Sequence, residues 1–165
     1  MSSASPLPRT VALLVGASLL AGCSAIVDRG QLQEERATET VAEEQTVIVH
    51  RTATCECCGG YEDHLAAEGF EVRQQLHEDL TEIKEAFGIP ESEASCHTNQ
   101  IGGYAIEGHM PTEAIERLLE EQPDVDGIAL AGMPAGSPGM PGAKEGPFVV
   151  TLIDDGQVVG EFGRF

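Results

Sequence analysis

The sequence contains few aromatic and few basic residues. Only 4% of its 165 residues are aromatic, tryptophan is absent, and the nine basic residues include only two lysines, Lys84 and Lys144. A core must therefore be built mainly from Val, Ile, Leu and Ala, which suffices for one domain of about 120 residues. Nucleic-acid binding is not expected, because phosphate contacts require clustered Lys and Arg, and no such cluster occurs.

Acidic residues dominate the charge. The chain has 28 Asp and Glu against 9 Lys and Arg, a formal net charge of -19. The acids are spread along the chain rather than gathered in one block. A dispersed acidic surface poor in lysine is similar to that of proteins from salt-loving microbes, in which salt screens the self-repulsion. We therefore expect a halophilic protein, with an ordinary acidic protein as the alternative.

The amino-terminal region is typical of an export signal. Residues 10–21 (TVALLVGASLLA) are apolar and are too few for a comfortable membrane span. They run into Leu-Ala-Gly-Cys, which resembles a lipobox with Cys23 as the lipid acceptor. We predict a signal peptide over 1–22, a polar tether over 23–44 and a folded domain over 45–165. An uncleaved anchor is the alternative, and both interpretations place the domain at the outer face of the cytoplasmic membrane.

The folded domain alternates strands and helices. Runs of β-branched and alternating residues predict strands, helical spacing predicts helices, and Asp154-Asp155-Gly156-Gln157 predicts a closing hairpin. The expected strands are 46–51, 70–75, 101–107, 148–153 and 158–162, and the expected helices are 59–68, 79–87 and 112–121. This β-α-β-α-β-α-β-β order indicates an α/β fold with a small central mixed sheet flanked by helices, of the thioredoxin-like type.

Three of the cysteines are clustered at one junction. Cys55, Cys57 and Cys58 lie between the first strand and the first helix. The positive end of a helix favours thiolates, which serve both as nucleophiles in disulfide exchange and as metal ligands. The position therefore allows redox chemistry and metal binding alike.

Further soft donors occur later in the chain. In the expected topology the loop that carries Cys96 and His97 faces the three cysteines. Met133 and Met140 lie in a Gly- and Pro-rich segment. Thiolate, imidazole and thioether together suit Cu(I), so we take these residues as candidate ligands, and His109 as a further candidate.

Each of these residues also has an ordinary explanation. The cysteines are compatible with structural disulfides in an exported protein, and the methionines with loop packing. A thiol–disulfide oxidoreductase that uses Cys55 and Cys58, and a zinc-stabilised domain, remain alternative functions. Disulfide exchange requires neither Cys57 nor the Cys96-His97 pair, which favours metal.

Together, the stretches TATCECCGGYEDHLAAEGFEV, ASCHT, GGYAIEGHMP and GMPAGSPGM resemble the DUF411 family, small exported proteins found with copper-resistance systems. The resemblance implies a thioredoxin-like fold and copper held by Cys55, Cys57, Cys58, Cys96 and His97. The family usually has a small or neutral residue in place of Glu56 and commonly Trp in place of Tyr61, which still offers an aromatic cover.

These observations predict a membrane-anchored copper-binding protein that acts in copper resistance or homeostasis. Metal binding is favoured over enzymatic activity. The expected partners are copper ions and other copper-handling proteins, and zinc is the alternative metal.

Overall fold

The structure, a computed structural model, describes residues 45–165. Its elements follow one another as β1 (Thr46–Thr52), α2 (Glu56–Ala67), β2 (Glu71–His77), α3 (Thr81–Ala86), η1 (Glu91–Glu93), β3 (Thr98–Ile101), β4 (Tyr104–Glu107), α4 (Thr112–Glu121), β5 (Gly127–Ala129), β6 (Val149–Asp154) and β7 (Gln157–Arg164). The predicted signal peptide (1–22), the lipid acceptor Cys23 and the tether (23–44) lie outside the described residues. Within residues 45–165, no helix is both long and apolar enough to cross a membrane.

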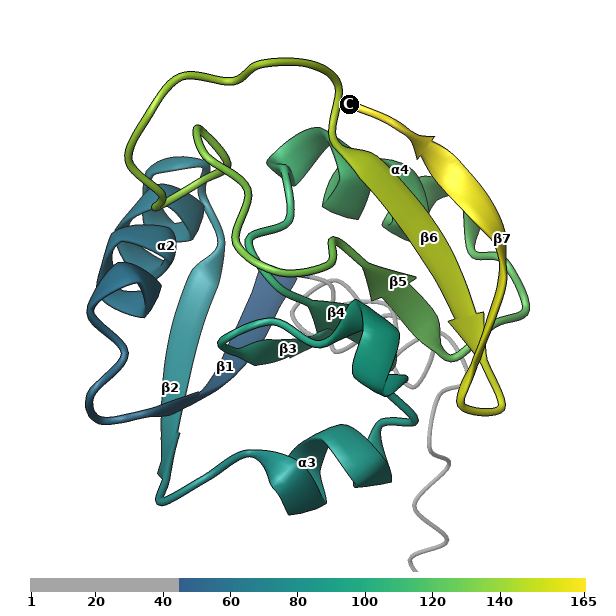
Figure 1. Cartoon of the computed structure of the whole chain (residues 1–165), viewed down its shortest axis with the longest axis horizontal. Helices are drawn as coiled ribbons and strands as arrows, with labels where there is room; N and C mark the ends of the chain where they lie inside the picture. The colour runs from purple at the N-terminus through teal and green to yellow at the C-terminus, as the bar shows by residue number, and fades with distance from the viewer. Residues whose placement is uncertain (1–44) are drawn as a thin grey trace, which may run out of the picture.

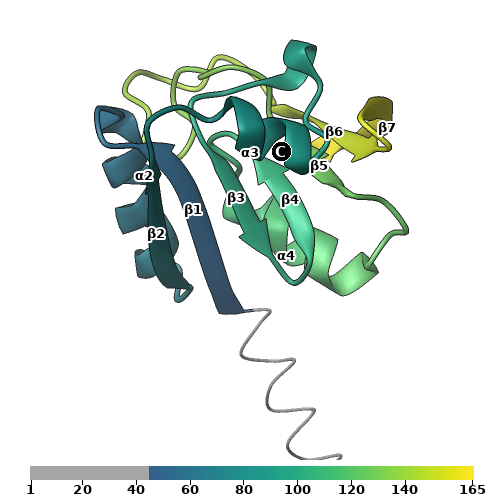
Figure 2. The same ribbon diagram turned by 90° about the horizontal axis from the view of Figure 1, so that it is seen from below.

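One mixed sheet organises the chain, with the strand order β2-β1-β3-β4-β5-β6-β7. β1 is parallel to β2 and β4 to β5, whereas the other neighbouring pairs are antiparallel. Parallel neighbours need a crossover, which α2 and α4 provide. Figures 1 and 2 show β2 at one end of the sheet and the β6–β7 hairpin at the other. This is the α/β class expected from the sequence, and its first four strands are consistent with a thioredoxin-like arrangement.

The core lies on both faces of the sheet because strand side chains alternate between them. On one face, a large cluster joins β1 to α2 and α4 and includes Val49, Leu65 and Ile115. On the opposite face, a smaller cluster packs against Phe87, the residue that follows α3; its members are Ile89, Ala105, Ala129 and Ile153. In Figure 2, α2 runs beside β1 and β2.

The prediction of a single strand over 101–107 was wrong. The segment forms a tight hairpin in which β3 and β4 pair antiparallel. Gly102 (φ 54°) and Gly103 (φ 88°) make the turn, since two consecutive positive φ angles suit the twist of a two-residue hairpin. The reversal brings the amino end of β3 beside the carboxyl end of β4, where the Gly108 N–H donates to the His97 carbonyl at 3.1 Å. His97 and His109 consequently become neighbours.

Two further predictions needed adjustment. α2 begins at Glu56 rather than at residue 59, so Cys57 and Cys58 lie inside its first turn. The segment 127–146, for which the sequence predicted neither a strand nor a helix, contains the short strand β5. Gly127 in this strand lies against the Ala105 carbonyl so closely that any side chain would collide with it. The observed order is therefore β-α-β-α-β-β-α-β-β-β, apart from the short η1 turn.

Candidate metal centre

Cys55, Cys57 and Cys58 lie where β1 gives way to α2. Cys55 is the N-cap residue of α2, with extended backbone (φ −78°, ψ 96°) and no capping hydrogen bond from its side chain. Its N–H donates to the Thr52 carbonyl at 3.2 Å, which closes the turn between strand and helix. The sulfurs therefore lie at the amino end of the helix, where partial positive charge favours thiolates.

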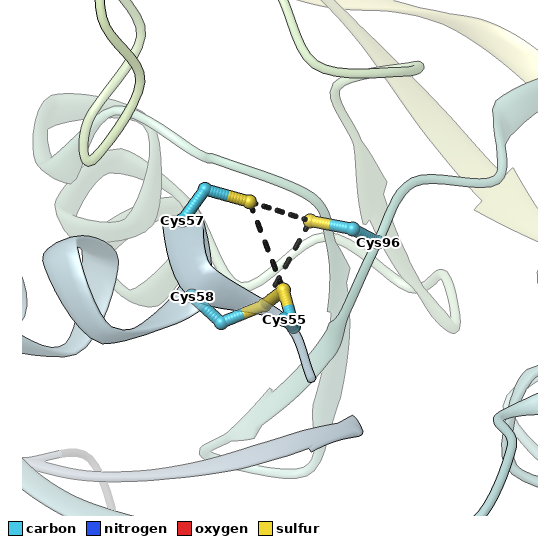
Figure 3. Close-up of side chains that lie close together, drawn as sticks. All are labelled: Cys55, Cys57, Cys58 and Cys96. Carbon is cyan, nitrogen blue, oxygen red and sulfur yellow. Dashed lines mark hydrogen bonds between the residues drawn. A yellow bond between two sulfur atoms is a disulfide. The ribbon is translucent and has the colours of Figure 1, made fainter. Parts of the chain in front are cut away.

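Cys96 reaches these three cysteines from the loop before β3. β1 and β3 are antiparallel neighbours with His50 opposite Thr98, so the end of β1 adjoins the start of β3. Cys96 Sγ lies 3.6 Å from Cys57 Sγ and 3.8 Å from Cys58 Sγ (Figure 3). The facing arrangement that the sequence predicted for Cys96 is thus present in the structure.

A disulfide joins Cys55 to Cys58, whose Cα atoms are 5.5 Å apart, and it is drawn as the sulfur–sulfur bond in Figure 3. Cys57 and Cys96 carry free thiols. Cys57 Sγ also lies 3.7 Å from Cys55 Sγ. All four sulfurs are within 4.8 Å of one another, so opening the disulfide with two electrons and two protons supplies four thiols at one place.

Two buried imidazoles approach Cys96. His97 Nδ1 lies 3.3 Å from Cys96 Sγ and 3.5 Å from Cys58 Sγ. His109 Nε2 lies 3.2 Å from Cys96 Sγ. The two rings are nearly perpendicular, with centroids 4.6 Å apart. His109, an open candidate in the sequence, therefore approaches Cys96 as closely as His97 does.

A backbone carbonyl sets the tautomer of His109. His109 Nδ1 donates to the Pro138 carbonyl oxygen at 2.7 Å. Because a carbonyl only accepts, Nδ1 carries the proton and the Nε2 lone pair faces Cys96. A carbonyl bonded to the far nitrogen is the usual support of a metal-binding imidazole. Buried His97 Nε2 has no hydrogen-bond partner among the described residues. These donors fit a metal ion.

Burial controls the protonation of these groups. It lowers the pKa of His97 from 6.5 to about 3, with smaller contributions from His109 and Lys84, and it lowers the pKa of His109 against the raising effect of the Pro138 hydrogen bond. Both rings are therefore neutral at pH 7, the form that binds metal. Burial, followed by contact with Cys57, raises the pKa of Cys96 to about 12. A bound cation must displace the proton of this thiol.

Tyr61 of α2 closes the buried side of the centre. Its ring centroid is 4.7 Å from that of His97 and 5.5 Å from that of His109. Its hydroxyl donates to the Met110 carbonyl at 3.3 Å, and burial raises the pKa of the phenol. The aromatic cover expected at this position is therefore present.

The open side of the centre is a cleft of about 700 Å³. Met140 lines it, whereas Met133 is 52% exposed and is not part of the lining. The structure thus brings one of the two candidate methionines near the sulfurs. The cleft is lined by Thr52, Thr54, Cys55, Glu56, Cys57, Cys96, Gly139, Met140 and Pro141, among which Glu56 is the only carboxylate.

A buried ion pair braces the Cys96-His97 loop, and sequence reasoning missed it. Glu107 is fully buried and pairs with Lys84. The Glu107 carboxylate also accepts hydrogen bonds from the Ser95 N–H and the Thr98 hydroxyl, both at 2.6 Å. It therefore holds the residues on either side of Cys96 and His97. The only sequence signal was indirect: Lys84 is one of two lysines in the chain.

Comparison with known proteins identifies a family for this chain. A family model described as "Protein of unknown function, DUF411" matches residues 93–140, a range that contains Cys96, His97 and His109. No curated protein sequence matches the chain.

Two solved structures, titled copper resistance protein CopG Form 1 and Form 2, are similar to the chain. Each is 36% identical, with a TM-score of 0.67. The matches cover 74% and 73% of this chain and 98% and 97% of the matched chains. The chain therefore belongs to the DUF411 family and is a homologue of the copper resistance protein CopG.

Proposed function

We propose that this protein binds copper outside the cytoplasmic membrane and serves copper resistance or homeostasis. Copper is its cargo, held as Cu(I) by Cys55, Cys57, Cys58, Cys96 and His97. The single observation that carries the proposal is the convergence of four sulfurs within 4.8 Å of one another. The family relationship supports the choice of copper, and zinc is the alternative metal.

Capture of Cu(I) requires the reduced protein. Once the Cys55–Cys58 disulfide is opened, four thiols face one another, and thiolates are the preferred ligands of soft Cu(I). The spacing of 3.6–3.8 Å between Cys96 and its neighbours allows one sulfur to bridge two ions, which favours a multinuclear cluster. Cycling between Cu(I) and Cu(II) at this cluster, with one electron per ion exchanged with a redox partner, is part of the same proposal.

The open cleft provides the route for the ion. Met140 lies in its lining together with Cys55, Cys57 and Cys96, so its thioether would be available, with the thiolates, to Cu(I) that enters the cleft. Another copper-handling protein would deliver or receive the ion at this mouth. The lipobox ending at Cys23 and the tether over 23–44 would hold the domain near the membrane, facing a salt-rich exterior that screens the net charge of -19.

The test measures metal content under anaerobic conditions. The full chain carrying Cys23→Ser, so that this cysteine adds no thiol, is reduced with dithiothreitol, freed of reductant and titrated with Cu(I) against a competing chelator. We expect more than one copper per chain, and Cys57→Ser should remove most of it. One zinc and no copper in the purified protein would instead indicate a zinc-stabilised domain.

A second candidate is a thiol–disulfide oxidoreductase, favoured by the disulfide at the amino end of α2. In that case a substrate thiolate attacks Cys55 or Cys58, forms a mixed disulfide and releases the other cysteine as a thiolate. Oxidation of a dithiol peptide by the disulfide form should survive Cys57→Ser, because this residue is not part of the bond. Absence of copper binding together with rapid exchange would replace the copper proposal with this one.

A further inference from the structure

The centre divides into two donor groups that share Cys96. One group contains the four sulfurs, and the other contains Cys96, His97 and His109. A disulfide joins Cys55 and Cys58, so these two sulfurs cannot act as thiolate ligands. The first group is therefore incomplete while the disulfide is closed. The second group contains neither of these residues and is complete while the disulfide is closed.

The spacing of the second group already suits one metal ion. Bonds of about 2.3 Å to sulfur and about 2.0–2.1 Å to nitrogen place a sulfur and a nitrogen ligand roughly 3.5 Å apart around a tetrahedral ion. The observed separations from Cys96 Sγ are 3.3 Å to His97 Nδ1 and 3.2 Å to His109 Nε2. Measured from Cys96 Sγ, both nitrogens are therefore within a few tenths of an ångström of ligand spacing, and all three donor atoms lie within 4.8 Å of one another.

Packing and hydrogen bonding hold the two rings in place. The Pro138 carbonyl fixes His109 with its Nε2 lone pair toward Cys96, and the ring of Tyr61 packs against that of His97. Gly139, which follows Pro138, lies so close to the second turn of α2 that a Cβ there would be 2.5 Å from Tyr61 N. Both histidines are fully buried. The two imidazoles are thus fixed in the interior by packing and by the hydrogen bond of His109, and Cys96 lies between them and the open cleft.

We propose that Cys96, His97 and His109 form a separate position that binds one divalent copper ion while the Cys55–Cys58 disulfide is closed. Two imidazoles and one thiolate are a donor set that accepts Cu(II). Binding involves no electron transfer: the ion replaces the Cys96 thiol proton, which passes to solvent. This inference deepens the proposed function and rests on it for the choice of copper.

Because both binding modes use Cys96, one chain cannot offer its full set of ligands in both modes at the same time. In the reduced protein Cys96 joins the thiolate group, and in the disulfide form it joins the imidazoles. The redox state of Cys55 and Cys58 would therefore decide which copper ion the centre accepts. Divalent copper would be held on the buried side, behind the sulfurs that line the open cleft.

The first experiment uses Co²⁺, which does not oxidise thiols, as the probe. The full chain carrying Cys23→Ser and Cys57→Ser is kept in the disulfide form under nitrogen, so Cys96 is its one free thiol. We expect one Co²⁺ per chain, a sulfur-to-cobalt charge-transfer band and protection of Cys96 from alkylation. Cu²⁺ should then displace Co²⁺ and produce a sulfur-to-copper band.

Histidine variants identify the remaining ligands. His109→Asn should weaken Co²⁺ binding by more than about 100-fold, since loss even of a residue that supports a ligand costs 10–100-fold. His64→Asn is the matched control, because His64 bonds to Thr112 outside the cluster and should leave binding unchanged. The alkylation assay on the parent protein needs no histidine variant, so it remains decisive if His109→Asn does not fold.

The outcomes separate this inference from the proposed function. Co²⁺ binding without a sulfur band or without protection of Cys96, unchanged binding in His109→Asn, or no Co²⁺ binding at all overturns the inference. If the reduced protein then still takes up Cu(I), the proposed function stands without it. If neither form binds its ion, both fail.

Discussion

The sulfur of Cys96 lies 3.6 Å from that of Cys57, although 39 residues separate them in the chain. The antiparallel pairing of β1 with β3 creates this contact by placing the start of α2 against the loop before β3. The contact converts two separate motifs into one centre. It also explains why the centre spans the open cleft and the buried imidazoles: Cys96 lies between them.

The first prediction concerns this shared residue. Cys96→Ser should abolish both Co²⁺ binding to the disulfide form and most Cu(I) binding to the reduced form, because both donor groups lose a ligand. Cys57→Ser should affect only Cu(I) binding to the reduced form. Metal content after equilibrium dialysis provides the measurement for each variant. A Cys96→Ser protein that retains the copper of its parent would show that Cys96 is not a ligand.

The second prediction concerns the Lys84–Glu107 ion pair behind the loop that carries Cys96 and His97. Lys84→Met leaves the fully buried Glu107 carboxylate without its cation, and we expect the free energy of unfolding to fall by about 3–5 kcal/mol. Adding Glu107→Gln to Lys84→Met should recover part of the loss by removing the buried charge. Urea denaturation measures the effect.

The other lysine provides the matched control for the brace. Lys144 lies over the ring of Phe148, with 4.6 Å between its Nζ and the ring centroid. Lys144→Met should cost less than about 1 kcal/mol. Equal losses for the two lysine variants would show that the Lys84–Glu107 pair has no special role in stability.

The third prediction tests the contact between the loop over 130–148 and α2. Gly139 has φ +76°, and a Cβ there would lie 2.5 Å from Tyr61 N and 2.9 Å from Gly60 C. Gly139→Ala should therefore cost about 1–2 kcal/mol for the left-handed backbone and about 1–3 kcal/mol more for the overlap. It should also weaken Co²⁺ binding, because Pro138 moves away from His109.

Gly132→Ala is the control for this variant. Gly132 also has a positive φ (+66°), but a Cβ there would meet nothing within 4 Å. Only the backbone cost should appear in its thermal or urea unfolding, and Co²⁺ binding should be preserved. If Gly139→Ala and Gly132→Ala are equally stable, the close approach at Gly139 does not contribute to the free energy of unfolding.

The fourth prediction concerns pH. Burial, aided by His77, lowers the pKa of His50 below 6.5, and His50 Nδ1 lies 3.1 Å from His77 Nε2. The unfolded chain protonates this histidine as the pH falls through 6.5, whereas the folded chain does so only at lower pH. The unfolded state therefore binds more protons, and stability must fall as the pH drops below 6.5.

Urea midpoints between pH 7.5 and 5 measure this dependence. Because one pKa unit corresponds to about 1.4 kcal/mol, His50 contributes at most that amount per pH unit. His50→Gln should show a shallower decline than the parent protein, in which buried His97 and His109 act in the same direction. If the urea midpoint falls equally steeply with pH in the two proteins, His50 does not contribute to the pH dependence of stability.

Much of the fold followed from local patterns. β-branched runs, the spacing of Ala114, Ile115 and Leu118, and the Asp-Gly turn at residues 155–156 act over a few residues, so strands, helix α4 and the closing hairpin were predictable. The Gly102-Gly103 turn was not predicted, because the segment 101–107 was expected to form one strand. A pair of glycines permits either a distortion within one strand or a reversal between two, and only pairing with β1 selects the reversal.

The sequence by itself determined the chemistry of the centre: which thiols, imidazoles and thioethers the chain carries, and that three thiols sit at a helix entrance. Only the tertiary structure decided which of them meet. It placed His109 beside Cys96, Pro138 behind His109, and the Lys84–Glu107 pair beneath the loop, while Met133 remained exposed. Those contacts join residues far apart in the chain, and strand pairing, which no local pattern encodes, brings them together.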